Sequence, residues 1–492
     1  MNPNLSSAGT NGTKKTSLPL NPRLIAAEYA VRGALALRAE ELKTELRTNP
    51  GSLPFDSVVN CNIGNPQQLG QKPLTFLSQV LCLVEAPKEL FEKIKTQFPE
   101  NVVERALEIK QAIPAMGAYS HSKGYDFIRK QVSTFIQARD QTSMTVDHER
   151  IFLSNGASEA ISRVLHCMAN DEGRLGVLIP IPQYPLYHAE LTLLGYLPVP
   201  YFMDETNDGW QLSKSQLEKA FEDAIQKGIN PIAIVLINPG NPTGNTLSSS
   251  QLHSVIQFGH EKGIAVLADE VYQDNVYPDA SQFTSCRKAA IQLEIYDKMN
   301  LFSFHSVSKG LMGECGRRGG YVECSPGISQ AFIEQLYKLS SLSLSPNTQG
   351  QLCVSVMVNP PKPGQPSYSL WMEERTAIYE SLMRRASKLA NSFNALEGVS
   401  CAPALGALYL FPRINFPKRF ISKAEEDGNA PDAVYAMELL NATGVCMVPG
   451  SGFGQVSGTF HVRSTFLPNE SDFDAFIARI SAFHSEFMRR YK

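Results

Sequence analysis

The sequence predicts an α/β protein in which a mostly parallel sheet lies between layers of helices. Between residues 151 and 324, short apolar runs alternate with helical patterns, and this alternation is typical of parallel sheets covered on both faces. The runs lack polar alternation, as expected for strands buried on both sides. They span residues 151–154, 176–180, 232–237, 264–268, 301–304 and 321–324.

Two helices of this block begin with the same signal. Ser213 is followed by Gln216, and Ser248 by Gln251; this spacing is a capping box, in which serine and glutamine side chains satisfy free backbone N–H groups. Apolar residues then recur on one helix face. They are Leu217, Ala220, Phe221, Ala224 and Ile225 in the first helix and Leu252, Val255 and Ile256 in the second.

A proline cluster divides the rest of the chain. No helix can cross Pro360, Pro361, Pro363 and Pro366, so we predict a domain boundary there, with a large domain over residues 85–365 and a smaller one over 366–492. Helical patterns follow the cluster. The first contains Ile378, Leu382, Leu389 and Phe393, and the last has Phe473, Phe476, Ile477, Ile480 and Phe487 on one stripe.

Composition excludes several classes of protein. The 492 residues include 45 basic and 48 acidic ones, a net charge of −3, so no basic surface is expected to recruit nucleic acid or an anionic membrane. No apolar run approaches the ~18 residues of a transmembrane helix. The nine cysteines show no CxxC pair, which favours free thiols in a reducing compartment.

The first twenty residues are rich in Ser, Thr, Asn and Gly and have no apolar segment. We expect residues 1–20 to be a flexible tail, not a secretory signal. Because arginine is missing until Arg23, we predict a cytoplasmic protein and keep the mitochondrial matrix as the alternative.

Lys309 and Asp269 are the first candidates for chemistry, since both follow strands at the edge where parallel sheets bind ligands. A lysine in the small-residue string Ser306-Val-Ser-Lys309-Gly can form a Schiff base with an aldehyde. A carboxylate at a strand end can pair with a protonated ring nitrogen. The alternatives are a solvated surface lysine and a helix N-cap.

Two further turns complete the pattern. The string Asn238-Pro-Gly-Asn241-Pro-Thr-Gly244 is a rigid turn that could aim the Asn241 amide at a phenolic oxygen, or a plain loop. Ser154-Asn-Gly156-Ala157-Ser158 precedes a helix, whose free N–H groups form an anion cradle or an ordinary cap. Arg317 or Arg318 could add a bidentate countercharge, unless both are surface charges.

Other motifs argue against competing chemistries. Gly450-Ser-Gly452-Phe-Gly454 lacks the GxGxxG spacing and is interpreted as a turn. No P-loop, HExxH or GxSxG occurs, and the nine histidines show no ligand spacing. We therefore predict no metal site and no NTPase, metallohydrolase or serine hydrolase activity.

In this order, these residues resemble the fold-type I, class I/II aminotransferases, and more closely the alanine aminotransferase family with its glutamate:glyoxylate relatives. The resemblance extends from about Asn21 to the C-terminus. It rests on Glu28-Tyr-Ala-Val-Arg-Gly33, Asn62-Ile-Gly64-Asn-Pro, Gly70-Gln-Lys-Pro73, Gly117-Ala-Tyr119-Ser, Pro182-Gln-Tyr184-Pro, His305-Ser-Val-Ser-Lys-Gly310, Gly313-Glu-Cys-Gly316 and Val448-Pro-Gly-Ser-Gly-Phe-Gly454.

The resemblance implies pyridoxal 5′-phosphate as the cofactor and a role for each site residue. Lys309 would carry the cofactor and move the substrate proton, Asp269 would pair with the ring nitrogen, and Tyr184 would stack on the ring. Asn241 and Tyr272 would bond its phenolic oxygen. Arg463 would bind the substrate carboxylate with Gly64 and Asn241 beside it. Gly156, Ala157, Ser158, Ser306 and Arg318 would hold the phosphate, joined by Tyr119 of a partner subunit.

Some of these roles have alternatives. Tyr184 and Tyr272 could be core aromatics, and Arg463 a charge at a strand edge. The broader class usually spaces the phosphate arginine one residue nearer the lysine, at Arg317, whereas the alanine aminotransferase pattern points to Arg318.

The family fold also implies a small α+β domain built from both chain ends, with residues 21–84 forming an N-terminal arm and part of that domain. The implied activity is ping-pong transfer from L-alanine to 2-oxoglutarate in a homodimer with shared sites. A glutamate:glyoxylate aminotransferase, a lyase of the same fold and a non-catalytic binder are the alternatives.

Overall fold

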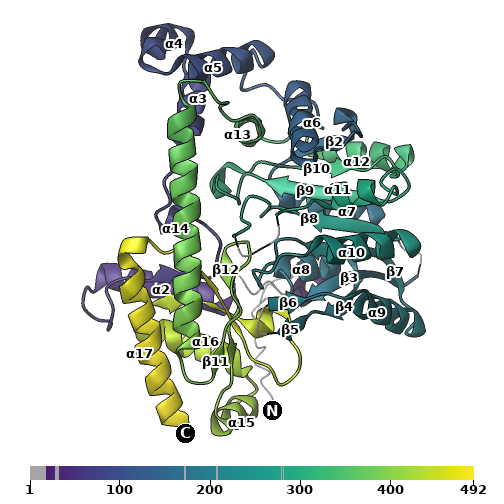
Figure 1. Ribbon diagram of the computed structural model, residues 1–492. Helices are drawn as coiled ribbons and strands as arrows, with labels where there is room; N and C mark the ends of the chain where they lie inside the picture. Colours follow the sequence, from purple (N-terminus) through teal and green to yellow (C-terminus); the bar gives the residue numbers. More distant parts are fainter. Residues whose placement is uncertain (1–17, 28–32, 171–172, 207–208, 279, 281) are drawn as a thin grey trace, which may run out of the picture.

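The computed structural model describes residues 18–27, 33–170, 173–206, 209–278, 280 and 282–492 (Figure 1). Within these residues the largest sheet has seven strands, in the order β2-β10-β9-β8-β7-β3-β4. Strands β4, β3, β7, β8 and β9 are parallel, and β10 runs antiparallel to β9 and β2. The strands are β2 Ile151–Ser154, β3 Leu175–Ile181, β4 Leu197–Phe202, β7 Asn230–Ile237, β8 Ala265–Asp269, β9 Leu301–Ser306 and β10 Gly320–Cys324.

The predicted α/β architecture is thus confirmed, and all six predicted strands are present. The sequence did not indicate β4, which contains Pro198 and Pro200. This strand lies at the edge of the sheet, where a missing N–H group breaks no ladder on the open side. An edge strand that contains proline is therefore missed when strands are predicted from apolar runs alone.

Helices cover both faces of this sheet (Figure 1). In β7, Val235 and Ile237 belong to one apolar cluster and Ile234 and Leu236 to another, because successive side chains of a strand point to opposite faces. Both predicted capping boxes are present. The surrounding helices are α6 Asp126–Asp140, α7 Ala157–Met168, α8 Pro185–Leu194, α9 Lys214–Gln226, α10 Ser249–Glu261, α11 Cys286–Gln292, α12 Gln330–Leu342 and α13 Thr348–Val358.

A second region joins the two ends of the chain. Strand β1 (Val59–Asn60) pairs in parallel with β14 (Val445–Cys446). This pairing supports the predicted small domain, whose boundaries stay a prediction. The C-terminal elements are α14 Tyr368–Asn394, β11 Val399–Ser400, β12 Tyr409–Leu410, β13 Arg413–Ile414, α15 Lys418–Glu426, α16 Pro431–Thr443, β15 Val448–Pro449, β16 Val462–Thr465 and α17 Phe473–Tyr491.

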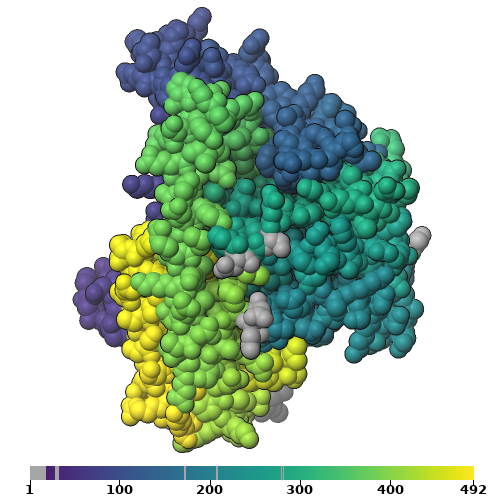
Figure 2. Space-filling view, in the orientation of Figure 1, coloured from purple at the N-terminus to yellow at the C-terminus, as the bar shows by residue number. Residues whose placement is uncertain are grey.

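Helix α14 begins after the proline cluster and lies along the surface beside α17 (Figure 2). The N-terminal helices are α1 Pro22–Ala26, α2 Ala34–Thr48, α3 Thr75–Glu85, α4 Lys88–Ile94 and α5 Glu100–Ala112, and β5 Asp204–Thr206 pairs with β6 Gly209–Gln211. Most of the predicted tail, residues 1–17, and residues 28–32 of the first family string lie outside the described residues.

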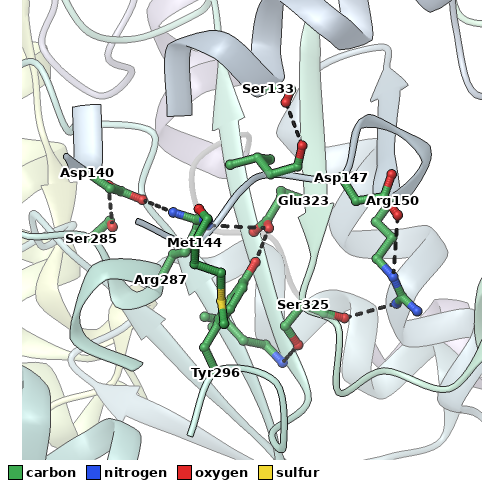
Figure 3. Close-up of polar contacts among 12 residues, drawn as sticks. Ser133, Asp140, Met144, Asp147, Arg150, Ser285, Arg287, Tyr296, Glu323 and Ser325 are labelled. Carbon is green, nitrogen blue, oxygen red and sulfur yellow. Dashed lines mark hydrogen bonds and ion pairs between the residues drawn. The ribbon is translucent and has the colours of Figure 1, made fainter. Parts of the chain in front are cut away.

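A buried ionic network ties α6 and α11 to the sheet (Figure 3). Arg287 is fully buried, and its Nη1 lies 3.1 Å from Asp140 Oδ2 and its Nε 3.8 Å from Glu323 Oε1. Ser285 donates to Asp140, and Tyr296 donates to Glu323. Removing one partner of such a network would leave a buried charge uncompensated, so these contacts hold α11 in one place against β10.

Two further structural observations bear on the predictions from composition. No helix among the described residues is long and apolar enough to span a membrane. All nine cysteines are free, and six of them are buried.

Candidate active site

A cavity of about 470 Å³ opens at the carboxyl ends of β7, β8 and β9. This volume lies within the roughly 300–1,000 Å³ typical of small-molecule and cofactor pockets. Eleven of the predicted site residues line it: Gly64, Ala157, Ser158, Tyr184, Asn241, Asp269, Tyr272, Ser306, Lys309, Arg318 and Arg463.

Lys309 follows strand β9, and its Nζ donates to the carbonyl oxygen of Gly64 over 2.6 Å. A Cβ atom at Gly64 would overlap the hydroxyl of Tyr409 and lie 3.1 Å from Lys309 Nζ. Glycine at this position therefore lets the lysine amine and the tyrosine hydroxyl come close together. Lys309 is not a solvated surface lysine.

Asp269 is the last residue of β8, and a turn, not a helix, follows it. The hydroxyl of Tyr187 donates to its Oδ2 over 3.0 Å, and the N–H of Val271 lies 3.5 Å from its Oδ1. Burial raises the pKa of Asp269 to about 6, opposed by these bonds and by the charge of Lys309. The position is therefore not a helix N-cap.

Tyr272 and Tyr409 meet at their hydroxyl groups, which are 3.0 Å apart. Tyr409 lies on β12 and reaches the cavity from the C-terminal region. Burial raises the pKa of Tyr272 well above its ordinary value. Burial acts in the same direction on Tyr409, but the positive charges of Lys309 and Arg463 outweigh it and lower the pKa of this phenol.

Arg463 lies on β16 and is almost fully buried, with 1% of its surface exposed. Its Nη1 donates to Asn241 Oδ1 over 2.9 Å, and its Nη2 donates to the carbonyl of Asn62. The guanidinium carbon is 4.4 Å from the ring centre of Tyr409 and 4.6 Å from that of Phe453. Arg463 is therefore not a charge at an exposed strand edge.

No carboxylate of the described residues forms a salt bridge with Arg463, and its Nε has no hydrogen-bond partner among them. A buried cation without an acidic partner is costly unless an anion completes it. The guanidinium lines the cavity and has the fork geometry that binds a carboxylate in bidentate fashion. The site is therefore suited to a carboxylate ligand.

The anion cradle lies at the start of α7, where Ala157 and Ser158 line the cavity. Gly156 precedes them with φ +87°, and a Cβ there would lie 2.5 Å from Arg318 Nη2. Arg318 lies 3.3 Å from Ser308 Oγ and 3.0 Å from the carbonyl of Asn155. Arg317 instead pairs with Glu314 and does not line the cavity.

Tyr119 lies outside this arrangement. It is 77% exposed and does not line the cavity of its own chain. Its role, like the roles of the other predicted residues, stays a prediction.

Sequence reasoning missed Tyr187, Tyr409, Phe453 and Ser308. Tyr187 lies in the first turn of α8, three residues after the N-cap residue Tyr184, and Ser308 is part of the lysine string, so both are close in sequence to residues that were predicted. Tyr409 and Phe453 had none, because the folding of the C-terminal region brings them to Arg463.

The fold and this cavity define a lysine-bearing α/β transferase site, and comparison with known families identifies it. The family model for class I and II aminotransferases matches residues 89–480, and the chain belongs to that family. The predicted family is confirmed.

Similar proteins in this family include alanine and glutamate–glyoxylate aminotransferases. Alanine aminotransferase 2 of Panicum miliaceum is 46% identical over 96% of this chain and 98% of its own length. Glutamate--glyoxylate aminotransferase 1 of Arabidopsis thaliana is 41% identical over 96% of each chain. A Saccharomyces cerevisiae protein named inactive alanine aminotransferase is 43% identical over 97% of this chain and 95% of its own.

Solved structures show the same fold. The structure of an alanine aminotransferase from Pyrococcus furiosus superposes with a TM-score of 0.73 over 95% of this chain and 100% of its own, at 23% identity. At this identity the likeness concerns the fold alone.

The family implies pyridoxal 5′-phosphate, and the donor set of the cavity fits it. An amine can react with the aldehyde, a carboxylate can face the ring nitrogen, and a helix N-terminus with Arg318 can hold the phosphate. Arg463, whose Nε has no hydrogen-bond partner and which pairs with no carboxylate of the described residues, leaves a place for a substrate carboxylate. Lys309, Asp269, the α7 N-terminus and Arg318 would hold the cofactor.

Proposed function

We propose that the protein is an alanine aminotransferase that transfers the amino group of L-alanine to 2-oxoglutarate by a ping-pong mechanism. The observation that carries this proposal is that Arg463, a buried cation with no acidic partner among the described residues, lies in the same cavity as Lys309 and Asp269. Full-length similarity to an alanine aminotransferase supports it. A relative named inactive is similar to the same degree, so sequence identity alone does not indicate an active enzyme. The presence of all these groups in one cavity is the better support for turnover.

The cavity has to accept the second carboxylate of 2-oxoglutarate as well as a small apolar donor, so similarity to an alanine aminotransferase, more than the charges of the cavity, supports L-alanine over aspartate as the donor. Three cations of the described residues line it: Lys309, Arg318 and Arg463. Lys309 would be bonded to the cofactor, Arg318 would pair with the cofactor phosphate, and Arg463 would pair with the substrate α-carboxylate. A fourth cation, which a dedicated aspartate site needs for its second carboxylate, is not among the lining residues. Ile63, Ile161, Leu186, Ile237 and Val271 add apolar surface.

Each residue then has a task in the transfer. The cofactor, when bound, supplies the sink for the Cα electrons and the carrier of the amino group. Arg463 would bind and orient the α-carboxylate, and the amine of Lys309 would take the proton from the substrate Cα and deliver it to the cofactor carbon that carries the amino group; with the second substrate the proton would move in the opposite direction. Asp269 would hold positive charge on the ring nitrogen, and Tyr184 would pack against the ring.

Rates with alternative donors test this proposal. We expect kcat/KM with 2-oxoglutarate to be higher for L-alanine than for aspartate, serine or tyrosine, with pyruvate and glutamate formed in equal amounts. Glyoxylate is expected as a second acceptor. If aspartate or tyrosine led alanine tenfold, about 1.4 kcal/mol in transition-state binding, the alanine assignment would be wrong. Keto acid formed without glutamate would indicate the lyase alternative, and no turnover a non-catalytic binder.

We also propose a homodimer with shared sites. Exposed apolar side chains, Tyr119, Leu342 and Leu344, lie on neighbouring segments, since Ser122 donates to the carbonyl of Leu344. The same segment reaches the anion cradle through Asn347, which donates to Asn155 and to the carbonyl of Arg318. A second copy covering this surface would bring its Tyr119 to the phosphate.

Hybrid dimers test this arrangement. Lys309→Ala and Tyr119→Ala subunits each form deficient homodimers, but a mixed dimer would contain one complete site, with Lys309 from one chain and Tyr119 from the other. We expect the purified mixed dimer to have up to half of wild-type activity. Activity no greater than the sum of the parent proteins would place Tyr119 outside the partner's site, and a monomer in sedimentation would exclude the dimer.

The cytoplasm is the proposed compartment, because nine free cysteines fit a reducing environment. The mitochondrial matrix is the alternative. Fractionation of the source cells distinguishes them.

A further inference from the structure

Behind Asp269 lies a buried tyrosine that has no role in the transfer described so far. Tyr187 is fully buried in α8 and does not line the cavity. Its hydroxyl donates to Asp269 Oδ2 over 3.0 Å, while the N–H of Val271 is 3.5 Å from Oδ1. The phenol is thus the nearer of these two donors to the carboxylate.

We propose that Tyr187 is a positioning residue that keeps Asp269 ionised and turned toward the ring nitrogen of the cofactor. This inference rests on the proposed function. Tyr187 would act through Asp269, because Asp269 lines the cavity and Tyr187 does not.

The direction of the hydrogen bond follows from the chemistry of the two groups. Burial, and then the negative charge of Asp269, raise the pKa of Tyr187 well above its ordinary value. The phenol therefore stays protonated and donates. A donor to a carboxylate favours the charged form, whereas burial favours the neutral one.

The other groups that face Asp269 cannot replace this bond. Burial raises its pKa to about 6, and besides Tyr187 the opposing groups are the Val271 N–H and the charge of Lys309. Tyr272 is a neutral phenol, because its own pKa is raised by burial. Glu270 accepts from the N–H of Cys286 and lies 3.8 Å from Arg139. Without the Tyr187 hydroxyl, the pKa of Asp269 would rise further.

The sign of the pH effect follows. A protonated Asp269 cannot pair with a cationic ring nitrogen, so cofactor affinity should decline as the pH falls through the pKa of Asp269. In Tyr187→Phe this decline should begin at a higher pH. Hydrogen bonds to charged groups are among the stronger ones in proteins. For Tyr187→Phe we therefore expect the affinity for the cofactor to fall about tenfold at pH 6.5, or 1.4 kcal/mol, and by less at pH 8.5.

The affinity is measured by titrating the cofactor-free protein with pyridoxal 5′-phosphate and following the absorbance, at pH values from 6 to 8.5. Tyr196→Phe is the matched control, because Tyr196 is a buried tyrosine whose hydroxyl donates to the carbonyl of Leu165 over 2.9 Å, and neither residue lines the cavity. It should bind like wild type at every pH.

The outcomes separate the two proposals. A wild-type protein that does not bind the cofactor would overturn the proposed function. If wild type binds and Tyr187→Phe shows the same affinity and pH dependence, the role of Tyr187 is wrong. An affinity loss that is equal at all pH values, or shared by Tyr196→Phe, would indicate a merely structural role and also overturn it.

Discussion

Lys309→Ala should abolish amino-group transfer, with kcat lowered by at least about 10⁴-fold, the upper end for loss of a general acid–base group. The variant loses the amine that takes the proton from the substrate Cα and passes it on during the transfer. Its other cavity groups, including Arg318 and Arg463, remain, so it should still bind cofactor and substrate. Stopped-flow and steady-state rates with alanine and 2-oxoglutarate measure the loss.

Lys298→Ala is the control, because Lys298 is exposed and its Nζ bonds the carbonyl of Glu294, outside the cavity. It should match wild type. A Lys309→Ala rate within tenfold of wild type would show that another group moves the proton. Cooperative unfolding of both variants at similar denaturant concentrations would establish that the loss is chemical and not a loss of fold.

Asp269→Ala should slow loss of the Cα proton on the order of a hundredfold or more, the typical effect of removing one preorganised electrostatic group from a site. The carboxylate is the negative partner that keeps the ring nitrogen charged. The kinetic isotope effect with α-deuterated alanine should increase, because proton removal would then limit turnover more strongly.

Asp432→Asn is the matched control for removing a buried carboxyl. Asp432 is fully buried, burial raises its pKa as it does for Asp269, and it accepts from the N–H of Ser451 and from Gln455 outside the cavity. Its loss should lower stability and leave the rate of proton removal unchanged. An unchanged rate in Asp269→Ala would remove that residue from the site.

The buried strands and the helix starts were predictable from the chain because their signals are local. Apolar runs of strand length and the boxes at Ser213 and Ser248 depend on neighbouring residues only. The same holds for Lys309, Asp269 and Asn241, each of which ends a strand or follows one within a few residues. Since parallel strands end at one edge, local positions already imply that these three side chains meet there.

Tertiary structure alone shows which of these groups are paired and which are not. The β12–β16 pairing brings Tyr409 beside Arg463, and α8 carries Tyr187 to Asp269; these partners are separated by tens of residues of chain. The choice between Arg317 and Arg318 as the cavity-lining arginine also depends on the fold, since adjacent residues point to different surroundings. Residue types and their spacing establish the chemistry available to this chain, whereas burial and long-range contacts, which no local pattern encodes, establish the charge and orientation of each group.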